Sequence, residues 1–220
     1  QDNVREFVLV GLGTTYKIHK NTQLYSNLSQ NYRSVTFSDI SIVNPAFTIN
    51  PNIKDENGYT LDFGFRGDVG NIVYYDITFF NLIYNDRIGF VQQIAEDGNV
   101  KSERGNVGDA NIIGLESLLD FNFQSFLPEY YKLRTYINTS FIASEYVNSD
   151  VNGVQGNNVE FIPRRNIKIG LKIGYKNITT NVQYTYVSQQ YTDASNAIES
   201  NLSGVIGIIP SYNILDLGFN

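Results

Sequence analysis

The chain has no cysteine, and this absence excludes several kinds of site. None of its 220 residues is a cysteine, so a disulfide framework, a thiolate metal site and a cysteine nucleophile are excluded within them. Charged residues are also scarce, at 17%, and the net charge is −6. Binding to nucleic-acid phosphates needs clustered Lys and Arg, and the sequence shows no such cluster. Nucleic acid is therefore not an expected partner.

Long apolar runs are missing as well. No stretch of about 18 apolar residues occurs, so the sequence encodes no transmembrane helix. A membrane-spanning strand escapes this test, because only every second residue of it contacts lipid. Aromatic residues, by contrast, reach 14%, with 16 Tyr, and the chain contains 18 Gly. This mixture favours strands and turns over helices.

Apolar and polar residues alternate with a period of two along most of the chain. In the clearest segment, 166–176, the apolar positions alternate with lysine and glycine. In a soluble sandwich the apolar side would face a core, whereas in a barrel it would face lipid and the lysines the lumen. The alternation predicts nine strands, at residues 5–19, 22–33, 58–67, 72–95, 112–126, 132–146, 164–176, 178–193 and 212–220.

Short and long connections alternate between these strands. Tight turns are predicted at 20–21, 68–71, 127–131 and 176–177, and long polar loops at 34–57, 96–111, 147–163 and 194–211. Outer-membrane barrels have this asymmetry, with brief periplasmic turns and extended outer loops. We therefore predict an all-β fold, an antiparallel transmembrane β-barrel. Such barrels have even strand numbers, so about nine strands indicate part of a larger barrel, of about 22 strands.

The segment 72–84 is apolar on both faces, and Asp76 distinguishes between them. A carboxylate is costly in lipid and can be hydrated in a lumen. We therefore expect one set of side chains to point outward with the lipid, namely Val73, Tyr75, Ile77 and Phe79. The opposite set, Tyr74, Phe80 and Leu82, is expected to point inward with Asp76.

Three passages resemble a known family. Asn106–Ala110, followed by Ile113–Glu116, resembles the Asn-Val-Gly-x-Ala…Gly-x-Glu signature that begins a strand in TonB-dependent outer-membrane receptors. Two further passages resemble the family's preceding loop with its descending strand and the next ascending strand, respectively Asn50–Glu56 with Leu61–Arg66, and Phe79–Ile88. Within the family, Tyr32–Ile40 and Tyr191–Ala194 are most similar to the branch that takes up ferric dicitrate. We expect the signature residues to build a loop-to-strand junction rather than to bind a ligand.

The resemblance implies a location and an activity. Residues 1–220 would be the later, C-terminal part of the receptor's barrel domain. The family's amino-terminal plug, its TonB-engaging box and its final strand are not found in them. The protein would lie in the bacterial outer membrane, contact its lipid, and import a ferric chelate such as ferric citrate or a siderophore while TonB pulls on the plug. It would be no enzyme and have no cofactor, the chelate being its ligand, and a surface lipoprotein is an open further partner.

Candidate site residues follow from the expected ligand and plug. An anionic chelate would be held by cations, because the Arg fork binds carboxylates bidentately. The candidate ligand residues lie near the loop ends of strands: Tyr32, Arg33, Arg87, Arg164, Arg165 and Gln189. For each of these arginines, a solvated rim charge is the alternative. The residues expected to face the lumen and its plug are Asp62, Arg66, Asp76, Glu116 and Asp120.

Other chemistry finds little support. His19, the single histidine, sits beside a tight turn, where it could not serve as a catalytic base at the outer rim. The segment 148–153 matches the opening of a calcium loop, but Val159 stands where the closing Glu belongs and Glu160 comes one place late. We therefore predict no metal site. Two alternatives stay open: an extracellular carbohydrate-binding or adhesion β-sandwich, and a passive porin without a plug.

Overall fold

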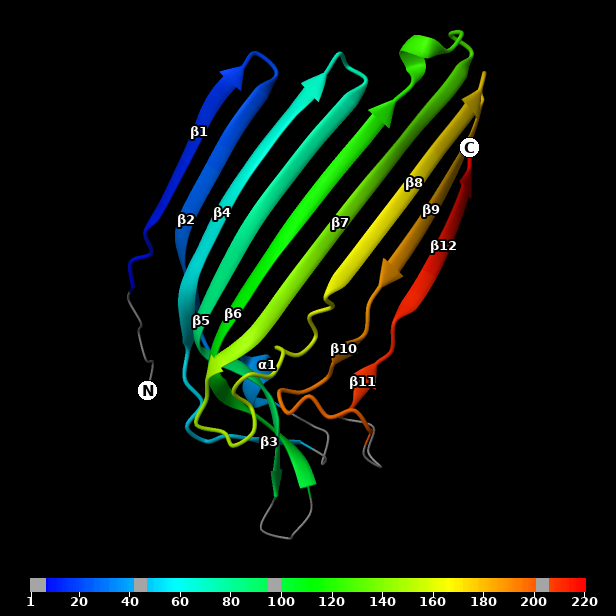
Figure 1. Ribbon diagram of the computed structural model, residues 1–220. Helices are drawn as coiled ribbons and strands as arrows, with labels where there is room; N and C mark the ends of the chain where they lie inside the picture. Colours follow the sequence, from blue (N-terminus) through cyan, green and yellow to red (C-terminus); the bar gives the residue numbers. More distant parts are fainter. Residues whose placement is uncertain (1–6, 42–46, 95–99, 201–205) are drawn as a thin grey trace.

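The structure, a computed structural model, describes residues 7–41, 47–94, 100–200 and 206–220. Its main feature is one antiparallel sheet whose nine long strands pair in the order β1-β2-β4-β5-β6-β7-β8-β9-β12 (Figure 1). These strands are β1 (Gly11–His19), β2 (Thr22–Arg33), β4 (Glu56–Val69), β5 (Val73–Ile94), β6 (Val100–Asn122), β7 (Tyr131–Asn148), β8 (Arg165–Tyr175), β9 (Ile178–Val187) and β12 (Tyr212–Phe219). The predicted all-β antiparallel fold and its nine strands are confirmed.

Shorter elements lie in the connections. A single helical turn, α1 (Phe37–Ile40), precedes β3 (Phe47–Ile49), which pairs in parallel with β6 at Ser102–Arg104. The 3-10 turn η1 (Gln124–Phe126) lies between β6 and β7, and β10 (Gln190–Tyr191) pairs with β11 (Ile208–Ile209). Among the described residues, no helix is long and apolar enough to cross a membrane.

The connections gather at two ends of the sheet, which we name the turn end and the loop end. The turn end carries the short connections 20–21, 70–72, 123–130 and 176–177, and the loop end carries the long ones (Figure 1). The tight turns at 20–21 and 176–177 are confirmed. The third connection, predicted at 127–131, is longer, because η1 extends it back to Phe123.

The prediction of a long loop at 96–111 is wrong. The structure continues β6 from Val100, paired with β5 as far as Ile94, so most of this loop is strand. Smaller errors are a strand predicted to 193 that ends at Val187, and a strand predicted from 58 that begins at Glu56. The start predicted at residue 5 lies outside the described residues, and β1 begins at Gly11.

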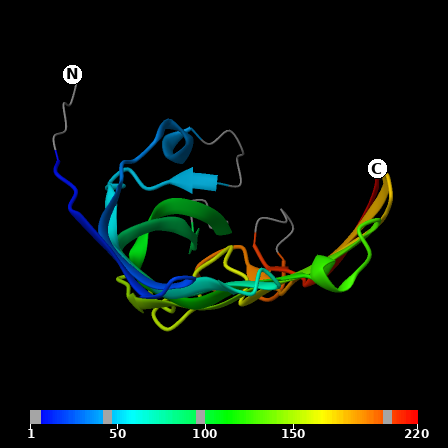
Figure 2. The same ribbon diagram turned by 90° about the horizontal axis from the view of Figure 1, so that it is seen from above.

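The sheet curves into a trough, and α1, β3 and the loop-end parts of β5 and β6 lie on its concave side (Figure 2). Asp39 of α1 contacts Arg33, which identifies the face of β2 that is concave. The register then shows which residues of the other strands lie on the concave face, because residues directly opposite each other share a face. Asp76 lies opposite Arg66 and Tyr74 opposite Asp120 on this face, so the predicted inward and outward sets of 72–84 are confirmed.

The convex face is apolar and has no second protein layer against it among the described residues. Phe63 is 51%, Ile169 43% and Leu171 37% exposed to solvent or lipid. A β-sandwich would bury these side chains between two sheets. The sandwich alternative is therefore wrong.

Three aromatic side chains on the concave face lie across glycines of the next strand. The directly opposed pairs are Tyr25 with Gly64, Phe80 with Gly114, and Tyr136 with Gly170. A Cβ added at Gly170 would lie 2.1 Å from the Tyr136 ring, and one at Gly114 would lie 2.4 Å from the Phe80 ring. The glycines therefore leave room for rings that cover the backbone of the adjacent strand.

A hydrophobic core exists only at the loop end of the described structure. Its buried members are Val91, Val107, Ala110, Ile112, Tyr146, Val154, Val159 and Ala194. Phe80 and Leu82 of β5 pack against this core on the side of the turn end. The core joins the β5–β6 hairpin to the end of β7, to the connection at 149–163 and to Ala194 after β10, so these parts form one packed unit.

Candidate functional site

The concave face of β4, β5 and β6 is acidic, and its carboxylates are hydrogen-bonded across strands. Tyr25 donates to Asp76 at 2.7 Å and Asn27 to Asp62 at 3.3 Å. Such contacts orient each carboxylate and leave its remaining lone pairs for other donors. The five residues predicted to face the lumen, Asp62, Arg66, Asp76, Glu116 and Asp120, all share this face by register.

The neighbouring strands β7 and β8 are basic on the same face. Arg134 donates two hydrogen bonds to the two carboxylate oxygens of Asp120, at 2.7 and 2.8 Å. This bidentate ion pair connects the basic strands to the acidic ones. Lys172 lies opposite Arg134, and Lys168 lies opposite Asn138. The concave face thus carries fixed charges of both signs along a wall that an ion or a folded domain could contact.

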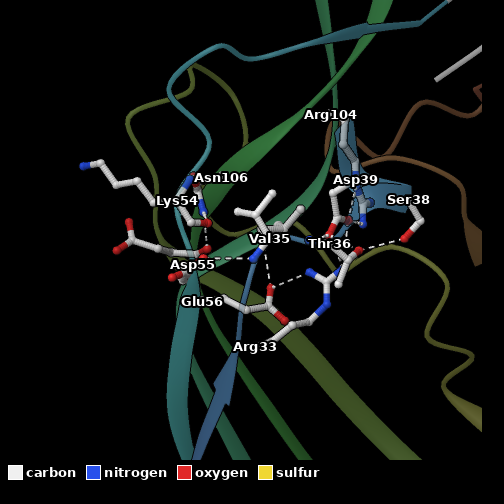
Figure 3. A network of polar contacts seen from close by, with 12 residues as sticks. Arg33, Val35, Thr36, Ser38, Asp39, Lys54, Asp55, Glu56, Arg104 and Asn106 are labelled. Atoms are coloured by element: carbon white, nitrogen blue, oxygen red, sulfur yellow. Dashed lines mark hydrogen bonds and ion pairs between the residues drawn. The ribbon is translucent and has the colours of Figure 1, made fainter. Parts of the chain in front are cut away.

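The mouth of the trough, at the loop end, holds a buried ion cluster (Figure 3). Its centre is Asp39 of α1, whose side chain is 1% exposed. Arg33 of β2 contacts both carboxylate oxygens, at 2.8 and 2.9 Å. Arg104 of β6 contacts Oδ1 of Asp39 from the other side, at 2.8 Å. Two strands that are not neighbours in the sheet therefore supply cations to one carboxylate.

Local hydrogen bonds also fix the Asp39 carboxylate. The backbone N–H and the hydroxyl of Thr36 donate to it at 2.9 and 2.7 Å, in the manner of a capping box. Burial alone would raise the pKa of Asp39, but the hydrogen bonds from Arg104, Thr36 and Arg33 hold this pKa well below its usual range. The carboxylate is therefore charged at any physiological pH.

Glu56 extends the ion cluster toward the β5–β6 hairpin. It accepts a hydrogen bond from the backbone N–H of Ile88 at 2.7 Å and lies 3.6 Å from Arg33. Its side chain is 7% exposed. Arg33 is thus placed between two buried carboxylates, and β2, β4, β5 and α1 are joined through it.

A second buried polar group contains Arg87, Tyr146 and Glu160. Tyr146 donates to Glu160 at 2.8 Å, and the Arg87 guanidinium lies 5.3 Å from the centre of the Tyr84 ring. Burial opposes the charge of Arg87, while Glu160, Tyr146 and Glu56 favour it and raise its pKa. The partners of Arg87 are therefore the buried groups of the packed unit.

A model of the TonB dependent receptor-like β-barrel family matches residues 2–220. This chain belongs to that family. TonB-dependent receptor barrels lie in the bacterial outer membrane and are transporters rather than enzymes. In this setting the apolar convex face contacts lipid and the charged concave face lines the lumen.

Solved TonB-dependent receptors share the fold at low sequence identity. The ferric citrate transporter FecA in its unliganded form is similar with a TM-score of 0.72 and 21% identity, over 96% of this chain and 30% of that one. The copper transporter OprC gives 0.68 and 16%, over 95% and 30%. The ferric yersiniabactin uptake receptor FyuA from Yersinia pestis gives 0.67 and 20%, over 95% and 29%. The chain thus spans less than a third of the length of these structures.

The receptor signature builds the loop-end unit of this barrel. Asn106 accepts from the backbone N–H of Lys54 at 2.6 Å and donates to the carbonyl oxygens of Lys54 and Asp86. Val107 and Ala110 are core residues. A Cβ added at Gly108 would lie 2.2 Å from the carbonyl oxygen of Asn148, so only glycine fits there. The contacts of these residues are with the protein itself.

The residues predicted to bind ligand do not form one group. Arg33 lies in the ion cluster and Arg87 in the second polar group. Tyr32 falls in the outward-facing set of β2, one residue before Arg33, and its hydroxyl donates to Asp55. The remaining three are spread over the loop end: Arg164 donates to Asn158 at 2.9 Å, Arg165 lies opposite Phe141 on the convex face, and Gln189 is exposed between β9 and β10.

Three residues that complete the ion cluster were not among the sites predicted from the sequence, namely Asp39, Glu56 and Arg104. One signal was available, since Thr36 followed three residues later by Asp39 is a capping-box pattern at the start of a helix.

The single histidine and the calcium-like loop show no further site. His19 is exposed beside the turn at 20–21. Glu160, one place from a calcium-loop position, binds Tyr146, and within the described ranges no cluster of three acidic, histidine or cysteine residues could hold a metal.

Proposed function

We propose that the receptor containing this chain imports a ferric chelate across the outer membrane by TonB-dependent transport. The observation that carries the proposal is the contrast between the two faces of the sheet in a TonB-dependent receptor barrel. The convex face is apolar and exposed. The concave face carries ion-paired side chains, and two arginines of the ion cluster lie at its mouth. A lumen of this kind supports the passage of a polar, charged ligand.

Ferric citrate is the chelate that we propose within this class. The passages Tyr32–Ile40 and Tyr191–Ala194 resemble the ferric dicitrate branch, and the first of them contributes Arg33 and Asp39 to the ion cluster. Arginine forks suit the carboxylates of such a chelate. Copper, which the similar OprC transports, favours soft ligands or imidazole. This chain contains no Cys, no Met and one His, so it offers few such groups.

The proposed transport also needs a plug domain and TonB. Residues 1–220 are proposed as part of the barrel domain, and a plug domain outside them engages TonB and fills the lumen. Asp62, Arg66, Asp76, Glu116 and Asp120 would contact that plug, because they share the concave face. Arg87, Arg164, Arg165, Gln189 and Tyr32 remain proposed ligand or rim residues, and a surface lipoprotein a proposed partner.

Uptake measurements test the proposal. A strain that lacks the gene should lose uptake of radioactive iron supplied as ferric citrate under iron limitation, and the full-length gene should restore it. A second strain without TonB should fail to take up the chelate even with the gene present. Uptake that continues without TonB would favour a passive porin, and copper uptake lost in place of iron uptake would contradict the choice of ligand.

A further inference from the structure

We propose that Arg33 and Arg104 form a binding site for a carboxylate of the transported ligand, and that Asp39 occupies this site as an internal latch when no ligand is bound. The proposal rests on the proposed function for the identity of the ligand.

The geometry is that of a carboxylate receptor. Arg33 comes from β2 and Arg104 from β6, with β4 and β5 between them in the sheet. Their guanidinium groups contact the same carboxylate with three N–O distances between 2.8 and 2.9 Å and a fourth, from Nε of Arg104, of 3.3 Å. Arg33 donates from one nitrogen to both oxygens, and Arg104 donates from two nitrogens to Oδ1. Two guanidinium groups that converge on one carboxylate can hold any carboxylate group placed there, whether or not it belongs to the chain.

The arginines are more accessible than the group they hold. The Arg33 side chain is 36% exposed and that of Arg104 is 18% exposed, whereas Asp39 is 1% exposed. Arg104 also lies over the Phe90 ring, 4.5 Å from its centre, which keeps its guanidinium plane fixed. The cations are therefore held by the barrel, and removal of Asp39 would open them to the trough.

The segment that carries Asp39 is held mainly by polar contacts. Besides the contacts of the Asp39 carboxylate, the backbone N–H of Val35 donates to Oδ1 of Asp55 at 2.9 Å. α1 has four residues, and Asp39 is the buried one among them. Its apolar side chains do not pack into the core, since Phe37 is 78% and Ile40 50% exposed. A helix this short has little stability of its own. Charged hydrogen bonds rather than hydrophobic burial therefore keep α1 at the mouth.

The strands on either side of α1 are anchored in the sheet, so the proposed movement of α1 leaves them in place. β2 is paired with β4 up to Arg33, and β3 is paired with β6 at Ser102–Arg104. A ligand carboxylate that replaces Asp39 gives both arginines a new partner, which compensates for the loss of the Asp39 charge next to these partly buried cations. Because the latch competes with the ligand, the apparent affinity is reduced by the fraction of receptor in which the site is closed.

Binding of ferric citrate to the detergent-solubilised full-length receptor tests the competition. Asp39→Asn keeps the shape of the latch and removes its charge, so the dissociation constant should fall about tenfold, within the usual range for coupled sites. Arg104→Gln should raise this constant. Asp86→Asn is the matched control, an exposed acid at the loop end whose replacement should change nothing. Unchanged or weaker binding by Asp39→Asn would overturn the latch while leaving the proposed function intact.

Movement of α1 gives a readout that does not depend on iron transport. Ser41 is exposed directly after α1, and a spin label on Ser41→Cys, as the only cysteine of the full-length receptor, reports its mobility. Iron-free citrate at millimolar concentration should mobilise the label, as should Asp39→Asn without citrate, whereas glycerol should have no effect. A label that stays immobile in both cases refutes the latch. Release by citrate in a receptor that imports no ferric citrate would support the latch and refute the proposed function.

Discussion

The wall of this barrel and its loop end are stabilised in different ways. Along the wall, the strands make one layer, and apolar side chains such as Phe63 and Ile173 are half exposed on the convex face. At the loop end, Val107, Tyr146 and Val154 are 2% exposed or less. The buried hydrophobic residues of the described chain all lie at this end.

The difference follows from the solvent that surrounds each region. Lipid covers the convex face of the wall, so its apolar side chains need no protein partner. The loop end projects into water, where apolar groups are stabilised only when other protein groups bury them. The chain therefore builds a core where the membrane ends, and the trough below it stays open for polar side chains.

The sharpest test of this comparison is Tyr146→Ala in the loop-end core. Loss of a fully buried aromatic should lower the free energy of unfolding by about 3 to 5 kcal/mol, and it also removes the hydrogen bond to Glu160. Hydrogen exchange should rise in residues 149–163, and urea titration in detergent gives the energy. Tyr16→Ala, at a side chain that is 69% exposed on the convex face, is the control. Equal losses at both positions would contradict the distinction between the two regions.

The wall is tested by Leu171→Arg on the convex face. An arginine placed toward lipid should cost about 2 to 4 kcal/mol near the bilayer midplane. Lys172→Gln changes the next residue, which faces the lumen, and should cost little. Folding into lipid vesicles, followed by urea titration, measures both variants. A larger effect at Lys172 than at Leu171 would mean that the two faces are assigned the wrong way round.

A smaller effect is expected inside the lumen, at Gly170→Ala. The added methyl group would meet the Tyr136 ring at 2.1 Å, and displacement of this ring should cost about 1 to 3 kcal/mol. At Gly13 the nearest atom to an added Cβ is 3.9 Å away, so Gly13→Ala should be close to neutral. The same vesicle assay compares them, and equal stabilities would show that the Tyr136 ring adapts without cost.

The sequence predicts the wall better than the loop end for the same physical reason. Lipid on one side of the wall and water on the other make apolar and polar residues alternate with a period of two along each strand. This period identified the inward position of Asp76 and the outward position of Leu171. Near Gly89 and Phe90 other segments cover the two faces of the β5–β6 hairpin, because Glu160 lies against Gly89 and Phe47 against Phe90. The period is lost there, and Val100–Asn111 reads as a polar loop. The ion cluster joins Asp39 to Arg104, and a contact between positions so far apart leaves no local pattern.

The parallel pairing of β3 with β6 has a consequence for the exchange of parts between receptors. It fastens the segment before β4 to the β5–β6 hairpin, so neither can be transplanted alone without exposing a strand edge. A chimeric receptor with a new ligand preference should therefore receive residues 34–55 and 86–108 from the same donor, together with the connection at 149–163 that covers the hairpin. In β5 and β6 the boundaries of the graft would fall at residues 86 and 108, so Phe80 and Ile112, at the start of the loop-end core, would stay with the recipient.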